Sequence, residues 1–117
     1  MWTIVTTDTF TAWLAVQHKS DRAAVLAAML VLQVQGPGLS RPYSDTIKGS
    51  LYMNMKELRI QSRGEPIRAF YAFDPGRRGV LLCAGNKTGN EKRFYAQMIA
   101  QADRELTDWL NALKNRR

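Results

Sequence analysis

Residues 55–95 read MKELRIQSRGEPIRAFYAFDPGRRGVLLCAGNKTGNEKRFY, and this stretch decides the fold class. Apolar and polar side chains alternate in its first part, as in a strand with one buried face. Turn sequences rich in Gly, Pro and Asp then divide the stretch. Three strands are predicted: 56–61, 67–73 and 80–84. Strands that follow one another through tight turns predict an antiparallel meander.

Outside this stretch, hydrophobic periodicity predicts one more strand and three helices. They are a strand at 2–7, helices at 9–19 and 21–33, and a final helix that begins with a Thr88-x-x-Glu91 capping box. We expect Thr7 or Asp8 to cap the first helix and Ser20 the second. The segment 39–54 is predicted to be a turn-rich, functional connection. The element order β-α-α-β-β-β-α predicts one α+β domain over residues 1–117, with its helices against one face of the sheet.

The basic residues are concentrated in one part of the chain. Residues 56–93 hold nine Lys or Arg and four Asp or Glu, so they carry +5 of the formal net charge of +7. A cationic surface on rigid strands, with tyrosine and phenylalanine nearby, is typical of a site that binds a polyanion. RNA is therefore the first ligand to consider.

Several other classes of site have no support in the sequence. The chain has one His and one Cys, far apart, so we expect no metal site, and no glycine-rich nucleotide motif indicates a cofactor. Cys83 lies in an apolar run and is predicted to be buried, and His18 is predicted to face solvent or to cap a helix C-terminus. We find neither a signal peptide nor a membrane span and expect a cytoplasmic protein.

Cationic side chains also suit RNA cleavage, in which a 2′-hydroxyl attacks the neighbouring phosphate. The reaction needs stabilisation of negative charge at phosphorus, which Arg and Lys supply electrostatically. It also needs a base for the 2′-hydroxyl and an acid for the leaving 5′-oxygen. The candidates are Glu57, Tyr95 or a lysine with a lowered pKa.

A set of short motifs in a fixed order covers nearly the whole chain. The motifs are Gly36-Pro37-x-Leu39-x-Arg41-Pro42, Lys56-Glu57-Leu58-Arg59, Arg68-x-x-x-Ala72-Phe73-Asp74-Pro75, Leu81-Leu82, Gly85-x-Lys87-Thr88-Gly89 and Phe94-Tyr95. In this order they resemble the RelE/ParE superfamily of type II toxin–antitoxin toxins, in its phage-derived, HigB-like branch. The resemblance implies a RelE-like fold and a metal-independent mRNA endonuclease that acts in the ribosome. It also implies a helix-turn-helix, HigA-like antitoxin that forms a hetero-oligomer with the toxin.

The resemblance also implies site residues on the second and later strands and on the last helix. The catalytic candidates are Arg68, Lys87, Glu57, Arg59 and Tyr95. The candidates for binding RNA or the ribosome are Lys56, Arg63, Lys92, Arg93 and Phe94. The best-studied branch of the superfamily has two lysines on the second strand, where this chain has Met55 and Glu57. Glu57 is therefore either a general base or an ion-pair partner of Arg59 or Arg68.

Two other functions are compatible with the sequence. A gyrase inhibitor, as in the ParE branch of the fold, would bind a protein and cut no RNA. A non-enzymatic basic module would bind nucleic acid through phosphate contacts, with an affinity that falls steeply with salt.

Overall fold

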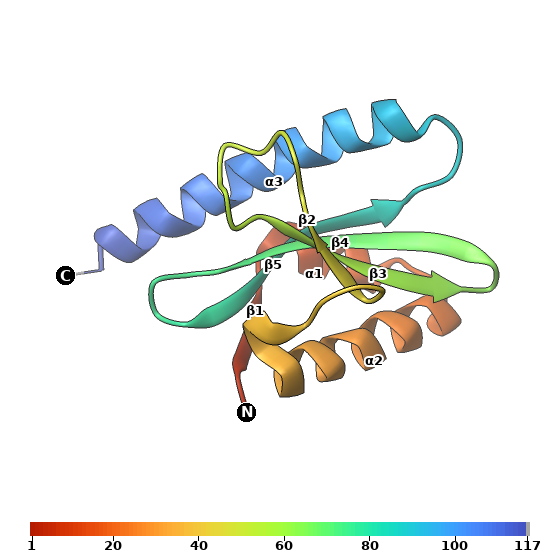
Figure 1. Cartoon of the computed structure of the whole chain (residues 1–117), viewed down its shortest axis with the longest axis horizontal. Coiled ribbons are helices and arrows are strands. Elements are labelled where there is room, and N and C mark those ends of the chain that lie inside the picture. Colours follow the sequence, from red (N-terminus) through yellow and green to blue (C-terminus); the bar gives the residue numbers. More distant parts are fainter. Residues whose placement is uncertain (117) are drawn as a thin grey trace.

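A computed structural model describes residues 1–116 of the chain (Figure 1). Its elements are β1 (Thr3–Thr6), α1 (Asp8–Ala15), α2 (Lys19–Gln35), a 3-10 turn (Gly36–Gly38), β2 (Ser44–Thr46), β3 (Lys56–Ser62), β4 (Glu65–Phe73), β5 (Arg78–Asn86) and α3 (Glu91–Lys114). The α+β class and the order of the predicted elements are confirmed. The short strand β2 is an addition.

The strands form a single five-stranded sheet in the order β1-β5-β4-β3-β2. The predicted meander of β3, β4 and β5 is confirmed, and β2 adds an antiparallel edge beside β3. Strand β1 pairs with β5 and runs parallel to it. In the chain, the helical hairpin α1–α2 separates β1 from the other four strands. β5 therefore lies between two strands, as its apolar sequence predicts.

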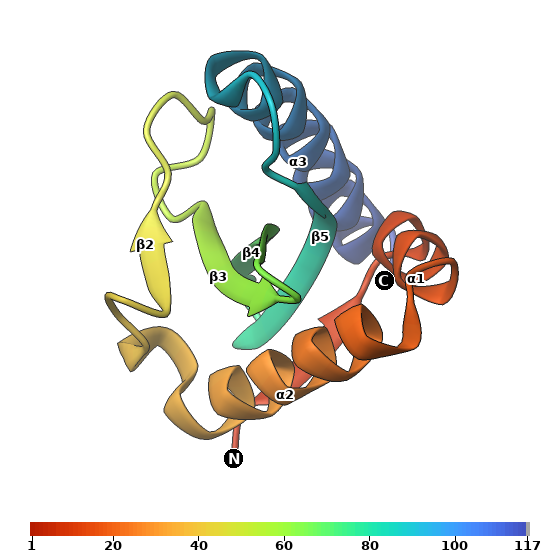
Figure 2. The same cartoon turned by 90° about the vertical axis from the view of Figure 1, so that its right-hand side faces the viewer.

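Helices cover both faces of the sheet, so the expectation that they lie against one face is wrong (Figure 2). Successive strand residues point to opposite faces, and β4 and β5 are apolar at nearly every position. On one face Tyr71 and Leu81 pack with residues of α1 and α2. On the other face Phe70 and Leu82 pack with residues of α3. A strand with two apolar faces needs cover on both.

Cys83 belongs to the α3 side of this core, as the sequence predicts for a buried cysteine. Its side chain is 1% exposed. Burial raises the pKa of the thiol to about 12, so almost no thiolate forms at neutral pH.

The helix N-termini differ in part from the predicted caps. Thr7 caps α1, which is one of the two predicted alternatives. His18, not Ser20, caps α2, because its Nδ1 accepts a hydrogen bond from the backbone N–H of Ser20. α3 is capped by Asn90, so the predicted Thr88 capping box is wrong.

The segment 39–54 is ordered by contacts with two elements. Strand β2 pairs with β3, and the buried carboxylate of Asp103 on α3 accepts hydrogen bonds from Ser50 Oγ and the backbone N–H of Leu51. Tyr52 bonds to Thr107 in the same helix. The segment is thus fixed to the sheet at one end and to α3 at the other, and it borders the site described next.

Candidate active site

The register of β3 and β4 places two arginines opposite each other. Arg59 pairs directly with Arg68, so both side chains lie on the same face of the sheet. The side chain of Arg68 is 11% exposed and that of Arg59 is 35% exposed. Like charges directly opposite each other destabilise a sheet, and partial burial weakens the screening by water. This pair therefore requires a nearby carboxylate.

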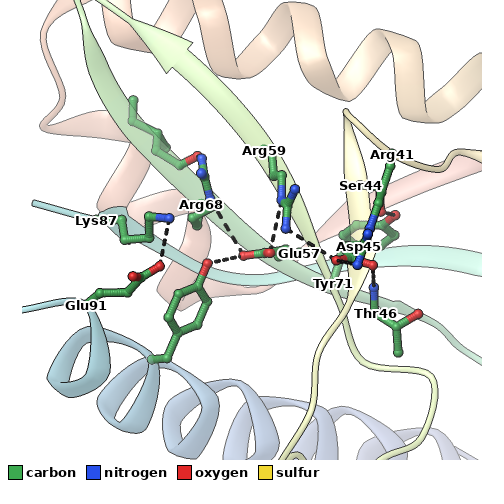
Figure 3. Close-up of polar contacts among 12 residues, drawn as sticks. Arg41, Ser44, Asp45, Thr46, Glu57, Arg59, Arg68, Tyr71, Lys87 and Glu91 are labelled. Atoms are coloured by element: carbon green, nitrogen blue, oxygen red, sulfur yellow. Dashed lines mark hydrogen bonds and ion pairs between the residues drawn. The ribbon is translucent and has the colours of Figure 1, made fainter.

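Glu57 supplies that carboxylate from β3, two residues before Arg59 (Figure 3). It is only 4% exposed. Its Oε2 accepts a hydrogen bond of 3.2 Å from Arg59 Nε, and its Oε1 lies 3.7 Å from Arg68 Nε. Glu57 therefore joins the two cations, as one of the two predicted alternatives requires.

Tyr95 reaches the same carboxylate from the second turn of α3. Its ring packs edge-on against Phe70, and its hydroxyl donates a 2.6 Å hydrogen bond to Glu57 Oε1. Burial, followed by the hydrogen bond to Glu57 and the charge of that group, raises the pKa of Tyr95 to about 12. At neutral pH this phenol is protonated and acts as a donor.

Lys87 lies directly after β5, at the edge of the cluster formed by Glu57, Arg59, Arg68 and Tyr95. Its Nζ is 3.0 Å from Glu91 Oε1 and 5.8 Å from the centre of the Tyr95 ring. Glu91 is mostly exposed, so this ion pair is screened by water and holds the lysine weakly. The amine can therefore exchange Glu91 for a ligand at little cost.

Arg68 is incompletely satisfied. Its Nη1 donates to the carbonyl oxygen of Ile67, but its buried Nε has no hydrogen-bond acceptor among residues 1–116. A buried donor without an acceptor is unfavourable. Because this Nε is buried and faces Glu57 Oε1 at 3.7 Å, an anion that binds Arg68 has to use its Nη groups.

Strand β2 and the turn before it add two site residues that the sequence analysis missed: Asp45 on the strand and Arg41 in the turn. Asp45 lies opposite Glu57 in the register of β2 and β3, and its Oδ2 contacts both Arg59 and Arg41. The sequence signal for β2 is three residues, Ser44-Asp45-Thr46, inside a turn-rich segment. That is too short for a strand period to be recognised.

The structure groups the other predicted residues less closely. Phe94 packs against Phe70 and Tyr95 under the cluster, whereas Lys92 and Arg93 are exposed in the first turn of α3. Lys56 precedes Glu57 on β3 and so points to the opposite face, where its Nζ is 3.4 Å from the carbonyl oxygen of Pro37.

Arg63, a predicted RNA- or ribosome-binding residue, makes its contacts away from the cluster. It lies in the turn between β3 and β4 and holds Asp21 of α2 through two hydrogen bonds of 2.8 and 3.2 Å. Ser62 donates to the same carboxylate. These contacts fasten the turn to α2, on the face of the sheet opposite Glu57.

This ion pair gives a pH-dependent stability. The hydrogen bond from Arg63 and that from Ser62 lower the pKa of Asp21 to about 2. A lowered carboxylate pKa stabilises the fold above the unfolded-state pKa of about 3.9, and the gain is lost as pH falls towards 2. We expect Asp21→Asn to melt at a lower temperature than the parent at neutral pH. The difference should shrink between about pH 4 and pH 2 in thermal melts followed by circular dichroism. A difference that stays constant down to pH 2 would contradict this role of the ion pair.

No group of three or more His, Cys, Asp or Glu side chains within residues 1–116 is arranged to hold a metal ion. In the same residues, no helix has the length and hydropathy of a membrane-spanning segment.

The protein is thus a small basic α+β protein with a cluster of charged side chains on one face of its sheet. Residues 12–107 match the model of the family Phage derived protein Gp49-like (DUF891), and the chain belongs to this family.

Two relatives come from Mycobacterium tuberculosis (strain ATCC 25618 / H37Rv). The chain is 41% identical over 98 residues to "Putative toxin HigB3", which covers 84% of each chain. It is 39% identical over 104 residues to "Putative toxin HigB2", which covers 88% of this chain but 52% of that protein. The predicted resemblance to HigB-like toxins is confirmed.

Proposed function

We propose that the protein is the toxin of a type II toxin–antitoxin system and cleaves mRNA on the ribosome. One observation carries the proposal: Arg59, Arg68 and Tyr95 converge on a buried Glu57, with Lys87 beside them. The similarity to HigB-like proteins named as toxins supports the biological role.

The reaction that fits this cluster is transesterification of the RNA backbone. The 2′-hydroxyl loses its proton to solvent and its oxygen bonds to phosphorus. The bond from phosphorus to the 5′-oxygen breaks as that oxygen gains a proton, and a 2′,3′-cyclic phosphate and a 5′-hydroxyl result. Arg68 stabilises the added negative charge at phosphorus, and Arg59 and Lys87 extend that field. Tyr95 is protonated, and it can donate to the leaving 5′-oxygen once its hydroxyl turns away from Glu57.

Glu57 serves in this scheme as a positioning residue. Both of its oxygens are engaged, one by Tyr95 and one by Arg59. These donors hold the carboxylate between the cations and the phenol. Glu57 can accept the 2′-proton only if one of these donors is released when RNA binds.

The partners follow from the proposed role. A protein of formal charge +7 attracts RNA and the ribosome electrostatically, and it also attracts an acidic partner segment. We propose a helix-turn-helix, HigA-like antitoxin that forms a hetero-oligomer with this chain in the cytoplasm.

The test is tightly repressed expression followed by mapping of the 5′ ends of cellular mRNA within minutes of induction. We expect new ends inside translated regions, in a fixed register with the reading frame, and far fewer of them with Lys87→Ala. Growth arrest with intact mRNA and DNA breaks would instead indicate a gyrase-type protein target. Intact mRNA and normal growth would favour a binding module without catalysis.

A further inference from the structure

Asp45 holds two arginines at one oxygen atom. Its Oδ2 lies 2.9 Å from an Nη2 of Arg41 and 3.3 Å from that of Arg59. Its Oδ1 accepts a 2.9 Å hydrogen bond from the backbone N–H of Thr46. Both carboxylate oxygens are thus engaged, which fixes the orientation of the group and brings the two guanidiniums together (Figure 3).

Asp45 and Glu57 lie deeper than Arg41 and Arg59. The side chains of Asp45 and Glu57 are 24% and 5% exposed, whereas that of Arg41 is 76% exposed. A guanidinium has five N–H donors, and Arg59 uses two of them on Glu57 and Asp45. Positive groups therefore face the solvent although acids of opposite charge lie beneath them.

Fold stability does not account for this arrangement. Arg41 is mostly exposed, and an exposed ion pair contributes little to stability because water screens it. The hydrogen bond from Arg41, the backbone N–H of Thr46 and then the charges of Arg41 and Arg59 keep the pKa of Asp45 below its usual value. The carboxylate therefore stays charged and holds both arginines at neutral pH. The remaining donors form a forked pattern that matches phosphate oxygens.

We propose that Arg41 and Arg59, positioned by Asp45, form a phosphate subsite for the RNA backbone next to the Arg68–Tyr95 centre. The inference rests on the proposed function, since it assigns the bound RNA a path over that site. Neighbouring strands are about 4.8 Å apart, so side chains on β2, β3 and β4 are spaced across the sheet. Single-stranded RNA that crosses the sheet would place one phosphate at Arg68 and the adjoining one at the Arg41–Arg59 pair.

The binding test uses short single-stranded RNA with 2′-O-methyl riboses, which lacks the attacking hydroxyl and cannot be cleaved by this route. Affinity is measured by fluorescence anisotropy over a range of salt concentrations. A second arm measures co-sedimentation with ribosomes, because the phosphate could belong to the message or to ribosomal RNA. The control is Arg104→Ala, which removes the same charge from an exposed position on α3.

We expect Arg41→Ala to weaken binding about tenfold and to lower the salt slope by about 0.7, as for one lost phosphate contact. Arg104→Ala should keep the slope of the parent. A loss in the oligonucleotide arm assigns the subsite to the message, and a loss in the ribosome arm alone assigns it to ribosomal RNA. If Arg41→Ala behaves like Arg104→Ala in both arms, the subsite does not exist.

Asp45→Asn distinguishes positioning from charge alone. This variant removes a negative charge, so simple electrostatics predicts tighter RNA binding. If Asp45 positions the two arginines, binding weakens in spite of the added net positive charge. Tighter binding would overturn the positioning role. If the unaltered protein binds neither RNA nor ribosomes, the proposed function itself fails. That result is distinct from a change in binding that is confined to the Arg41 or Asp45 variants.

Discussion

Replacing Arg68 by alanine is expected to reduce RNA cleavage by at least about 100-fold and to abolish growth arrest. The guanidinium is 11% exposed, and its Nε lacks a hydrogen-bond acceptor among the described residues. The part of the side chain that reaches the surface can take a phosphate oxygen where water screens it little. In this setting the stabilisation of charge in the transition state is large.

The fold should survive this substitution. Glu57 keeps its hydrogen bonds from Tyr95 and Arg59, so its charge remains compensated, and we expect a loss of at most about 2 kcal/mol in stability. Thermal melts should confirm a folded variant before activity is compared. Arg68→Lys keeps the charge but not the planar fork, and should recover only part of the activity. A folded Arg68→Ala variant as toxic as the parent would refute the site.

The meander was predictable because its signals are local. Leu58 and Ile60 alternate with Glu57 and Arg59, and this period of two defines a strand with one polar face. The turn between β3 and β4 is also local: Arg63 and Gly64 have φ values of 52° and 75°, which fits a two-residue hairpin turn.

The two-sided cover of the sheet was not predictable in the same way. The near-continuous apolar sequence of β4 and β5 indicates two buried faces, but it does not say which helix covers which face. That choice depends on the parallel placement of β1 beside β5, which is a tertiary contact. Strand β2 likewise depends on its pairing with β3. Its three residues are too few to show a recognisable period in the sequence.

The candidate site was also predictable only in part: its residue types could be predicted, but their contacts could not. Residue types and resemblance selected Glu57, Arg59, Arg68 and Tyr95, and the structure brings these four together. Their contacts depend on strand register and on the packing of α3, which no local pattern encodes. Arg63 shows the converse, because its basic charge suggested RNA but its position opposite Asp21 gives it a partner within the fold.

Glu57→Ala is expected to cause the largest loss of stability, about 3–5 kcal/mol. It would leave Arg59 and Arg68 opposite each other with no carboxylate between them, and it would remove the acceptor of the Tyr95 hydroxyl. Glu57→Gln keeps the shape and one acceptor oxygen, so a smaller loss of about 1–3 kcal/mol is expected. Chemical denaturation of the two variants and the parent measures both values. Equal losses would show that the charge of Glu57 matters and its shape does not.

The same glutamine variant separates a positioning Glu57 from a catalytic base. The carboxylate of Glu57 raises the pKa of Tyr95 through a hydrogen bond and through its charge, and burial raises it further. In Glu57→Gln, an absorbance titration of the tyrosines should place Tyr95 below its parent value of about 12 but still above that of an exposed phenol. If Glu57 positions the cations, cleavage falls about tenfold and any acidic limb of the pH–rate profile remains, because that limb then belongs to a group other than Glu57. If Glu57 is the base, cleavage falls by about 100-fold or more and that limb disappears, while the tyrosine titration shifts in the same way.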